Sequence, residues 1–402
     1  MNVTIEKSLA RGRVAAPPSK SMAHRYLIAG ALSGGSTVRG VSGSEDMNAT
    51  LDCLTALGAT VTRQGDTVTI GGAVPRQGAS RPLGCRESGS TLRFMIPLCL
   101  LGETPVTLTG SRRLMQRSLA IYEELCAARG LTCQPDSDRV TVCGPLPAGT
   151  YRVRGDISSQ FISGLMLALP LLDGDSEVEI TGTLESGAYL DITARAMADF
   201  GVTVIRPDSR HIRLPGGQRY APRALTVEGD YSNAAFLEAL HYLGGQVTVT
   251  GLPEDTAQGD AVYRQWFPRL AAGCPTLDIA DCPDLGPVLM ALAAAHHGVR
   301  LTGTRRLRIK ESDRGSAMAE ELRKMGIRCR VEENEIAVEP GTLHAPSRPL
   351  DGHNDHRIVM AMSLLCTRTG GTITGAEAVN KSFPDYFTRL ASLGVAVRED
   401  TP

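Results

Sequence analysis

Short runs of alternating apolar and polar residues recur along the chain, and six of them end in glycine. Such alternation is typical of a β-strand with one buried face. Successive glycines of this series are separated by 70, 72, 69, 52 and 72 residues. The series consists of Gly40, Gly110, Gly182, Gly251, Gly303 and Gly375. This nearly constant spacing predicts six copies of one structural unit.

A second glycine follows each member of the first series, after a stretch of apolar residues at helical spacing. Glycine suits the left-handed conformation that often ends a helix. The second series consists of Gly58, Gly130, Gly201, Gly273, Gly326 and Gly394. Because the two series run in step, each unit is expected to contain a helix that ends at its second glycine.

The second unit shows the expected order of elements most clearly. A short strand precedes an apolar helix over 90–101, a strand follows at 106–109, and a second helix covers 117–128. A hairpin with aspartate at its turn closes the unit, which gives the order β-α-β-α-β-β. Hairpins are predicted at the same place in four units, over 60–72, 131–144, 202–216 and 327–341.

The fourth and sixth units depart from this order. The fourth runs from Gly273 directly into its next strand without a hairpin, which accounts for the gap of 52 residues. The sixth ends after one strand, and residues 2–5 resemble the second hairpin strand of the first unit. The N-terminal strand is therefore expected to complete the sixth unit.

This closure predicts an α/β protein of two domains, as 402 residues are too many for one ordinary core. Units one to three would form a domain over 19–228. Units four to six would form a discontinuous domain of residues 1–18 plus 229–402. The two crossings between them favour a hinge, with the active site in the interdomain cleft.

Composition narrows the function classes. The net charge of −1 argues against a nucleic acid or a membrane as the main partner, and no signal peptide or membrane-length apolar stretch is visible. Ten cysteines without a Cys-x-x-Cys pattern are expected to be free thiols. We expect a cytoplasmic monomer that acts on small molecules.

The loop before the first helix of every unit is polar, and the free N–H groups of a helix N-terminus bind anions well. Ordinary N-capping explains any one of these loops. Lys20, Arg25 and Arg357, however, place positive charge where the helix dipole disfavours it, which favours an anion site. The loops are residues 18–25, 87–90, 156–160, 230–233, 281–284 and 353–357.

The loops before the second helices are rich in cations, including Arg117, Lys310, Arg314 and Lys381. A solvated helix start with local ion pairs would explain residues 310–314 alone. The recurrence of cations in the same place in several units instead suggests a substrate with more than one anionic group.

Other chemistries find little support. No nucleotide-binding glycine loop and no serine-hydrolase elbow is present. His353 and His356 flank Asp355, but no third ligand at metal spacing is visible, so no metal site is predicted.

Taken together, the motifs resemble the 5-enolpyruvylshikimate-3-phosphate (EPSP) synthase family over essentially the whole chain. The matching strings are PSKSMAHR, ESGSTLR, LMQR, GDISSQF, CPDLGP, RIKESDR, NDHR and KSFPDYF. The resemblance implies two inside-out α/β domains of three units each. It also implies transfer of the enolpyruvyl group of phosphoenolpyruvate to shikimate 3-phosphate, without a metal or organic cofactor.

The resemblance assigns roles position by position. As catalytic residues it implies Asp284, Glu311 and Lys20. For shikimate 3-phosphate it implies Lys20, Ser21, Arg25, Ser158, Ser159, Gln160, Ser186, Asp284 and Lys310. For phosphoenolpyruvate it implies Lys20, Gly89, Arg117, Gln160, Arg314, Arg357 and Lys381.

Two departures from the family pattern stand out. Arg306 occupies a position where relatives often have asparagine, and Glu87-Ser88-Gly89-Ser90 replaces the common Asn-Ala-Gly-Thr. We expect altered sensitivity to the inhibitor glyphosate. Two rival functions remain: a sibling enzyme that uses UDP-N-acetylglucosamine as acceptor, whose usual loop cysteine near Arg117 is missing here, and a non-catalytic sensor of anionic metabolites.

Overall fold

The computed structural model describes residues 1–400, which form two compact units. One comprises residues 1–17 and 229–402, and the other comprises 18–228. The division expected from the sequence differs from this one only at Pro18. We call the first the discontinuous unit and the second the continuous unit.

The continuous unit contains three sheets. In strand order they are β13-β3-β5-β4, β6-β7-β9-β8 and β10-β11-β12. The strands are β3 (Ser36–Arg39), β4 (Thr60–Gln64), β5 (Thr67–Gly71), β6 (Leu83–Gly84), β7 (Val106–Thr109), β8 (Thr132–Pro135), β9 (Arg139–Cys143), β10 (Thr150–Arg154), β11 (Ser176–Thr181), β12 (His211–Leu214) and β13 (Ala224–Thr226). β7 and β11 are each parallel to the strand that precedes the first helix of their repeat, and they are antiparallel to β9 and β12. β3 is antiparallel to β5 but parallel to β13, which lies at the other end of this unit's sequence.

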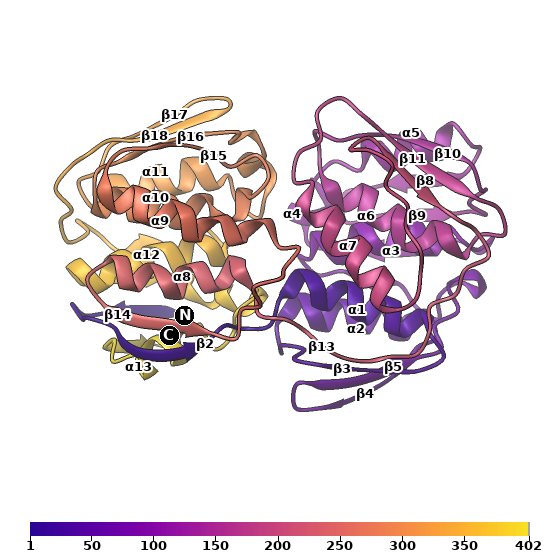
Figure 1. The fold of residues 1–402 in the computed structure, drawn as a ribbon, viewed down its shortest axis with the longest axis horizontal. Helices are drawn as coiled ribbons and strands as arrows, with labels where there is room; N and C mark the ends of the chain where they lie inside the picture. The colour runs from indigo at the N-terminus through magenta and orange to yellow at the C-terminus, as the bar shows by residue number, and fades with distance from the viewer. Residues whose placement is uncertain (401–402) are drawn as a thin grey trace. The chain divides into compact units, whose positions relative to one another are not determined.

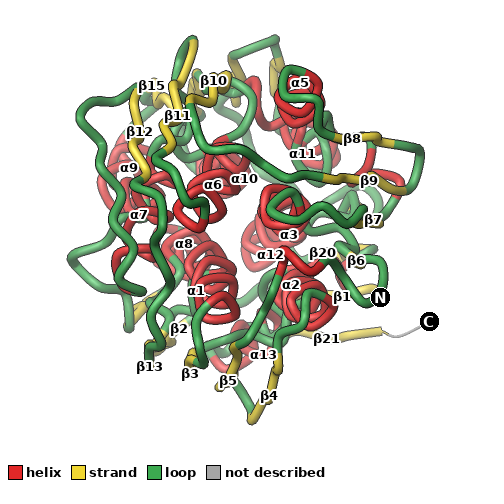
Figure 2. The backbone as a smooth tube through the Cα atoms, turned by 90° about the vertical axis from the view of Figure 1, so that its right-hand side faces the viewer, coloured by secondary structure: helices red, strands yellow, loops and turns green. Residues whose placement is uncertain are grey.

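Helices fill the inside of this unit, and the sheets lie outside them (Figures 1 and 2). Its helices are α1 (Lys20–Leu32), α2 (Glu45–Ala56), α3 (Gly89–Cys99), α4 (Arg112–Met115), α5 (Ala120–Ala127), α6 (Ser159–Ala168) and α7 (Ala188–Asp199), with short 3₁₀ turns at Pro75–Gln77 and Leu169–Leu171. The first helices α1, α3 and α6 are buried almost all round. Apolar residues on most faces of these helices favour such a position.

The discontinuous unit repeats this plan with sheets β14-β2, β15-β16-β18-β17 and β19-β20-β1-β21. Its strands are β1 (Asn2–Ile5), β2 (Arg11–Ala15), β14 (Gln246–Thr250), β15 (Thr276–Asp278), β16 (Val299–Thr302), β17 (Cys329–Val331), β18 (Glu335–Val338), β19 (Leu350–Asp351), β20 (Gly371–Thr374) and β21 (Val397–Asp400). Its helices are α8 (Tyr231–Tyr242), α9 (Tyr263–Ala272), α10 (Gly286–Ala295), α11 (Arg314–Lys324), α12 (His356–Thr369) and α13 (Tyr386–Ser392). Its 3₁₀ turns are η3 (Gly259–Val262), η4 (Pro283–Leu285), η5 (Arg305–Ile309) and η6 (Ala376–Lys381).

The N-terminal strand completes the sixth unit, as predicted. β1 lies between β20 and β21 and is antiparallel to both. Val3 and Ile5 are fully buried in the core below this sheet. The fourth unit has no hairpin, which also agrees with the prediction.

Two details differ from the sequence prediction. Residues 202–206 do not form a hairpin strand, because the Gln218 side chain binds the backbone N–H and C=O of Thr203 and leaves one isolated bridge, Ile205 to Arg213. The second helix of unit two begins at Ala120, since Ser111 caps the separate short helix α4 and places Arg117 in the link.

The strands next to the two crossings are exchanged between repeats, which agrees with the expected domain boundaries. β2 precedes α1 in the chain but pairs with β14 of the fourth repeat, whereas β13 precedes α8 but pairs with β3 of the first repeat. Each crossing of the chain therefore falls between a strand and its helix. Within residues 1–400, no helix is both long and apolar enough to traverse a lipid bilayer.

Candidate active site

Side-chain caps begin most of the first helices. Ser19, Ser88, Ser158, Asp230 and Asp355 each accept a hydrogen bond from a backbone N–H in the first turn of α1, α3, α6, α8 and α12. Capping thus explains these five polar residues. The cations beside them need a separate account.

Lys20, the first residue of α1, pairs with Asp46 on α2 at 2.8 Å. The protein itself therefore supplies an anion at this helix N-terminus, and the charge of Lys20 does not by itself require a ligand. Asp46 was not among the predicted site residues, because nothing local in the sequence shows that α2 begins beside α1.

Gly89 is surrounded by polar groups of the continuous unit. A Cβ atom at this position would lie 3.0 Å from Arg117 Nη1, 3.0 Å from Arg93 Nη1 and 3.5 Å from Gln160 Oε1. The structure thus brings the predicted residues Gly89, Arg117 and Gln160 together. Arg117 Nε is buried and has no hydrogen-bond partner within the described part of the chain.

Gln160 and Arg93 link the starts of α6 and α3. Arg93 Nη1 donates to Gln160 Oε1 at 2.8 Å, and Gln160 Nε2 donates to Ser90 Oγ at 2.9 Å. Sequence reasoning missed Arg93. The available signal was its position four residues after Gly89, which places both on one face of the helix.

Arg25 is buried and bonded within the protein. Its guanidinium donates to Thr193 Oγ1 at 2.7 Å, to the Ser21 carbonyl at 2.7 Å and to Ser163 Oγ at 3.2 Å. Burial lowers the pKa of Arg25 to about 10. Arg25 therefore joins α1, α6 and α7, and it lies next to the predicted residue Ser21.

Ser158, Ser159 and Ser186 are all buried at the starts of α6 and α7. Ser186 adopts a left-handed φ of 59° directly before α7. The backbone N–H of Glu185 donates to the Gly155 carbonyl at 3.2 Å, so the two loops adjoin. Two adjoining helix starts with hydroxyl side chains form a suitable phosphate site.

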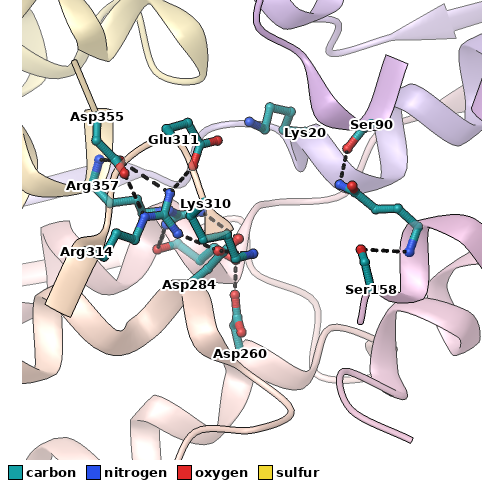
Figure 3. A network of polar contacts seen from close by, with 12 residues as sticks. Lys20, Ser90, Ser158, Asp260, Asp284, Lys310, Glu311, Arg314, Asp355 and Arg357 are labelled. Atoms are coloured by element: carbon teal, nitrogen blue, oxygen red, sulfur yellow. Dashed lines mark hydrogen bonds and ion pairs between the residues drawn. The ribbon is translucent and has the colours of Figure 1, made fainter. Parts of the chain in front are cut away.

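Arg314 is the centre of the corresponding cluster in the discontinuous unit. It is 1% exposed and donates to Asp284 Oδ1 at 2.7 Å, to Glu311 Oε2 at 2.7 Å and to Asp355 Oδ2 at 2.9 Å (Figure 3). Burial disfavours the charged guanidinium, but the three carboxylates outweigh burial and raise the pKa of Arg314 above its usual value. Asp355 is a further residue that sequence reasoning did not include in the site.

Asp284 has three cationic neighbours: Lys310 Nζ at 2.9 Å, Arg314 at 2.7 Å and Arg357 Nη2 at 3.5 Å. Burial favours its neutral form, but these cations outweigh burial and hold the pKa of Asp284 well below its usual range. Asp284 is therefore a carboxylate at neutral pH, as an acceptor of protons must be.

Arg357 and Lys381 extend this cluster. Arg357 Nη1 donates to the Ser232 carbonyl at 2.9 Å, and Lys381 Nζ donates to the Asn354 carbonyl at 2.6 Å. Ser232 Oγ also donates to the buried Asp260. Burial, with the nearby charge of Asp284, raises the pKa of Asp260 to about 7.

The histidines considered for zinc do not converge. His356 Nδ1 lies 3.8 Å from Asp355, whereas His353 Nε2 lies 2.9 Å from Glu321 Oε1. Potential ligand atoms of Glu320, Glu321 and His353 do lie within 4.8 Å of one another. Lys324 Nζ, however, already binds both Glu321 oxygens at 2.8 and 2.7 Å, and its positive charge opposes a cation there.

Comparison with known proteins identifies the family. Residues 4–390 match the EPSP synthase (3-phosphoshikimate 1-carboxyvinyltransferase) family. The 3-phosphoshikimate 1-carboxyvinyltransferase of Clostridium kluyveri is 36% identical over 420 residues, covering 99% of this chain and 98% of that protein. The enzyme of the same name from Clostridium novyi is 35% identical, with 99% and 98% covered.

Solved structures support the fold. The EPSP synthase of Acinetobacter baumannii has a TM-score of 0.78 and 24% identity, covering 99% of this chain and 100% of that one. The chain belongs to the EPSP synthase family. The predicted family, enzyme class and two-domain inside-out α/β fold are thus confirmed.

Proposed function

We propose that the two clusters carry out the reaction of this family, in which phosphoenolpyruvate gives its enolpyruvyl group to the 5-hydroxyl of shikimate 3-phosphate and phosphate leaves. The observation that carries the proposal is the arrangement around Arg314. Two carboxylates, Asp284 and Glu311, each lie 2.7 Å from one buried guanidinium. A purely anion-binding protein gains nothing from two carboxylates beside its cations.

Each substrate anion finds a matching set of groups. The starts of α6 and α7, with Ser158, Ser159 and Ser186, suit the phosphate of shikimate 3-phosphate, and Lys310 adds a charge. Arg314 and Arg357 suit the carboxylate of phosphoenolpyruvate, because guanidinium groups bind carboxylates in a planar fork. Lys20, Arg117, Lys381 and the N-terminus of α3 at Gly89 suit its phosphate.

In the addition step, Asp284 accepts the proton of the 5-hydroxyl while that oxygen bonds to C2 of phosphoenolpyruvate. Glu311, in its protonated form, gives a proton to C3, so the methylene becomes a methyl group. Ser21, Arg25 and Gln160 orient the shikimate ring. The product of this step is a tetrahedral intermediate that still carries both phosphates.

In the elimination step, a proton leaves the methyl group and returns to Glu311 or Lys20. The electron pair re-forms the double bond as the C2–O bond to phosphate breaks, and phosphate departs. A positioned acid or base contributes about 10²–10⁴-fold to such steps. The cations stabilise the departing phosphate.

Substrate binding would replace some of the ion pairs around Arg314. Arg314 is held by Asp284, Glu311 and Asp355, all of which compete with the substrate carboxylate. Once Arg314 engages the substrate, Glu311 loses a cationic partner and takes up a proton more readily. Loss of this ion pair on substrate binding would thus prepare Glu311 to act as an acid.

The deciding experiment measures phosphate release from phosphoenolpyruvate in three samples. One contains shikimate 3-phosphate, one contains UDP-N-acetylglucosamine, and one contains no acceptor. Release with shikimate 3-phosphate, and none with UDP-N-acetylglucosamine or without acceptor, is the expected result. Release with the nucleotide sugar alone would assign the chain to the sibling activity. Binding of both proposed substrates without release would favour the sensor function.

We also propose a cytoplasmic monomer. All ten cysteines are free thiols, which suits a reducing compartment. Size-exclusion chromatography with light scattering should give the mass of one chain, 42.7 kDa. A mass of twice that value would contradict the monomer.

A further inference from the structure

A strained turn connects β19 to α12 in the discontinuous unit. His353 and Asn354 both adopt left-handed conformations, with φ of 48° and 51°. Two successive non-glycine residues in this region persist only where surrounding contacts hold them. The turn is therefore fixed by something outside its own backbone.

This turn supports two contacts of the proposed site. The Asn354 carbonyl accepts the hydrogen bond of Lys381 Nζ at 2.6 Å. The next residue, Asp355, accepts a hydrogen bond from Arg314 Nε at 2.9 Å. It also accepts one from the backbone N–H of Arg357 at 2.9 Å. A change in the turn would therefore move three residues assigned to phosphoenolpyruvate.

The side chain of His353 ties the turn to α11, the helix that begins at Arg314. His353 Nε2 lies 2.9 Å from Oε1 of Glu321, which is fully buried. The backbone N–H of Asp351 donates a hydrogen bond to Glu321 Oε2 at 2.9 Å. The backbone N–H of His353 donates one to Asp351 Oδ1 at 2.7 Å. Glu321 thus anchors the turn at two points.

We propose that His353, held by Glu321, is a positioning residue for phosphoenolpyruvate: it keeps the 353–354 turn in its left-handed form and so places Lys381, Arg314 and Arg357. His353 itself touches no substrate. The inference rests on the proposed function, because it assumes the assignment of those three cations to phosphoenolpyruvate.

The charges around His353 make this contact depend on pH. The charged groups that act on its ring are Glu321 and Glu320 on α11 and Asp351 on β19, and Lys324 on α11 binds Glu321. The hydrogen bond to Glu321 outweighs partial burial and raises the pKa of His353 above its usual 6.5. The charge-assisted bond is therefore fully present below pH 6.5 and is lost as pH rises through the pKa of the folded protein.

The test compares His353→Gly with His353→Gln. Glycine adopts a left-handed φ without strain but lacks the contact with Glu321, whereas glutamine can offer an amide N–H near the position of Nε2. Because this charge-assisted hydrogen bond is lost, His353→Gly should raise KM for phosphoenolpyruvate about tenfold. KM for shikimate 3-phosphate and kcat should change less. In His353→Gln, KM for phosphoenolpyruvate should return most of the way to the wild-type value.

A pH series adds a second readout. The ratio of KM for phosphoenolpyruvate between His353→Gln and wild type should fall as pH rises from about 6 to about 8.5, because only the wild type loses a charged partner there. Titration of the substrate affects both proteins and cancels in the ratio. The exposed His241→Gln variant, on α8, serves as the matched control and should keep the wild-type values.

Two outcomes would overturn the inference. One is a wild-type KM for phosphoenolpyruvate in His353→Gly, and the other is an equal rise of this KM in His353→Gly and His353→Gln. Lys381→Met tests the proposed function separately, since it should raise the same KM whatever the role of His353. If His353 acts through Lys381, the effects of His353→Gly and Lys381→Met should be less than additive in the double variant. Strict additivity would also count against the inference.

Discussion

Gly89 shows most directly how one residue limits the site. An added methyl group would lie 3.0 Å from both Arg117 Nη1 and Arg93 Nη1, where those guanidinium groups must shift. We expect Gly89→Ala to raise KM for phosphoenolpyruvate by about tenfold, the equivalent of one displaced charge-assisted hydrogen bond. Inhibition by glyphosate should weaken as well, because a side chain here would intrude on either ligand.

Steady-state kinetics of a matched glycine variant checks this expectation. Gly84 lies in the same unit, has no positive φ, and would have no neighbouring atom within 4 Å of an added methyl group. Gly84→Ala should therefore leave KM unchanged. Equal kinetics for Gly89→Ala and wild type would remove Gly89 from the phosphoenolpyruvate site.

The acid assigned to the carbon centre gives a second prediction. Glu311→Gln keeps the size of the side chain and can still bind Arg314, but it cannot transfer a proton. We expect kcat to fall by about 10²-fold or more, while shikimate 3-phosphate binding measured by calorimetry stays within about threefold. The exposed Glu333→Gln variant is the control. Unchanged turnover of Glu311→Gln would exclude the acid–base role.

Asp260 gives a stability prediction with a defined sign. Its pKa of about 7 in the folded protein exceeds that of an unfolded aspartate, about 3.9. Ionisation therefore costs folding free energy above about pH 4, and the full cost is reached above about pH 7. Asp260→Asn, which still accepts from Ser232, should raise the free energy of unfolding by roughly 1–4 kcal/mol at about pH 8 but little at about pH 4.

Urea unfolding at both pH values measures this difference, with exposed Asp173→Asn as the control. A gain of equal size at both pH values would show that ionisation of Asp260 is not its cause.

At the scale of elements, the repeat makes much of the fold predictable. Two glycine series locate the six units, and the missing hairpin and the N-terminal strand follow from them. The expected domain boundaries place β2 in the discontinuous unit and β13 in the continuous unit. Their partners β14 and β3 could not be predicted, because the sequence of a strand does not specify its partner. Residues 202–206 alternate like a strand, yet the distant Gln218 binds their backbone.

The candidate site, like the fold, could be predicted only in part from the sequence. Cations and helix caps are visible as local patterns, and the family resemblance supplies their expected roles. Asp46, Arg93 and Asp355 were missed because their contacts arise from packing between helices. His353 was noticed only as a possible metal ligand, since its link to Glu321 depends on how the turn lies against α11.

The central position of β1 gives a prediction for an element to which no substrate contact is assigned. Ile5 is fully buried, and its loss leaves a cavity, so Ile5→Ala should reduce the stability of the discontinuous unit by about 2–5 kcal/mol. Exposed Asn2→Ala on the same strand is the control. Urea unfolding followed by far-ultraviolet circular dichroism measures both, and equal stabilities would contradict the placement of β1 in the sheet.

For the whole molecule, the net charge of −1 conceals local concentrations of cations. Long-range attraction of anionic substrates is therefore weak, and recognition depends on guanidinium forks and helix N-termini that select oxyanions. Both substrates carry tetrahedral phosphate groups. Sulfate has the same shape and should compete at these positions, whereas chloride acts mainly by screening exposed charges.

Sulfate should accordingly raise KM for both substrates more than chloride does at the same ionic strength, and kcat should stay nearly constant. We expect a difference of roughly threefold or more at about 0.15 M ionic strength, where screening is the same for both salts. In Gly89→Ala, sulfate should raise KM for phosphoenolpyruvate much less than in the wild type. It should still raise KM for shikimate 3-phosphate as in the wild type. Equal effects of the two salts would mean that the clusters attract anions by charge alone, without a phosphate-shaped site.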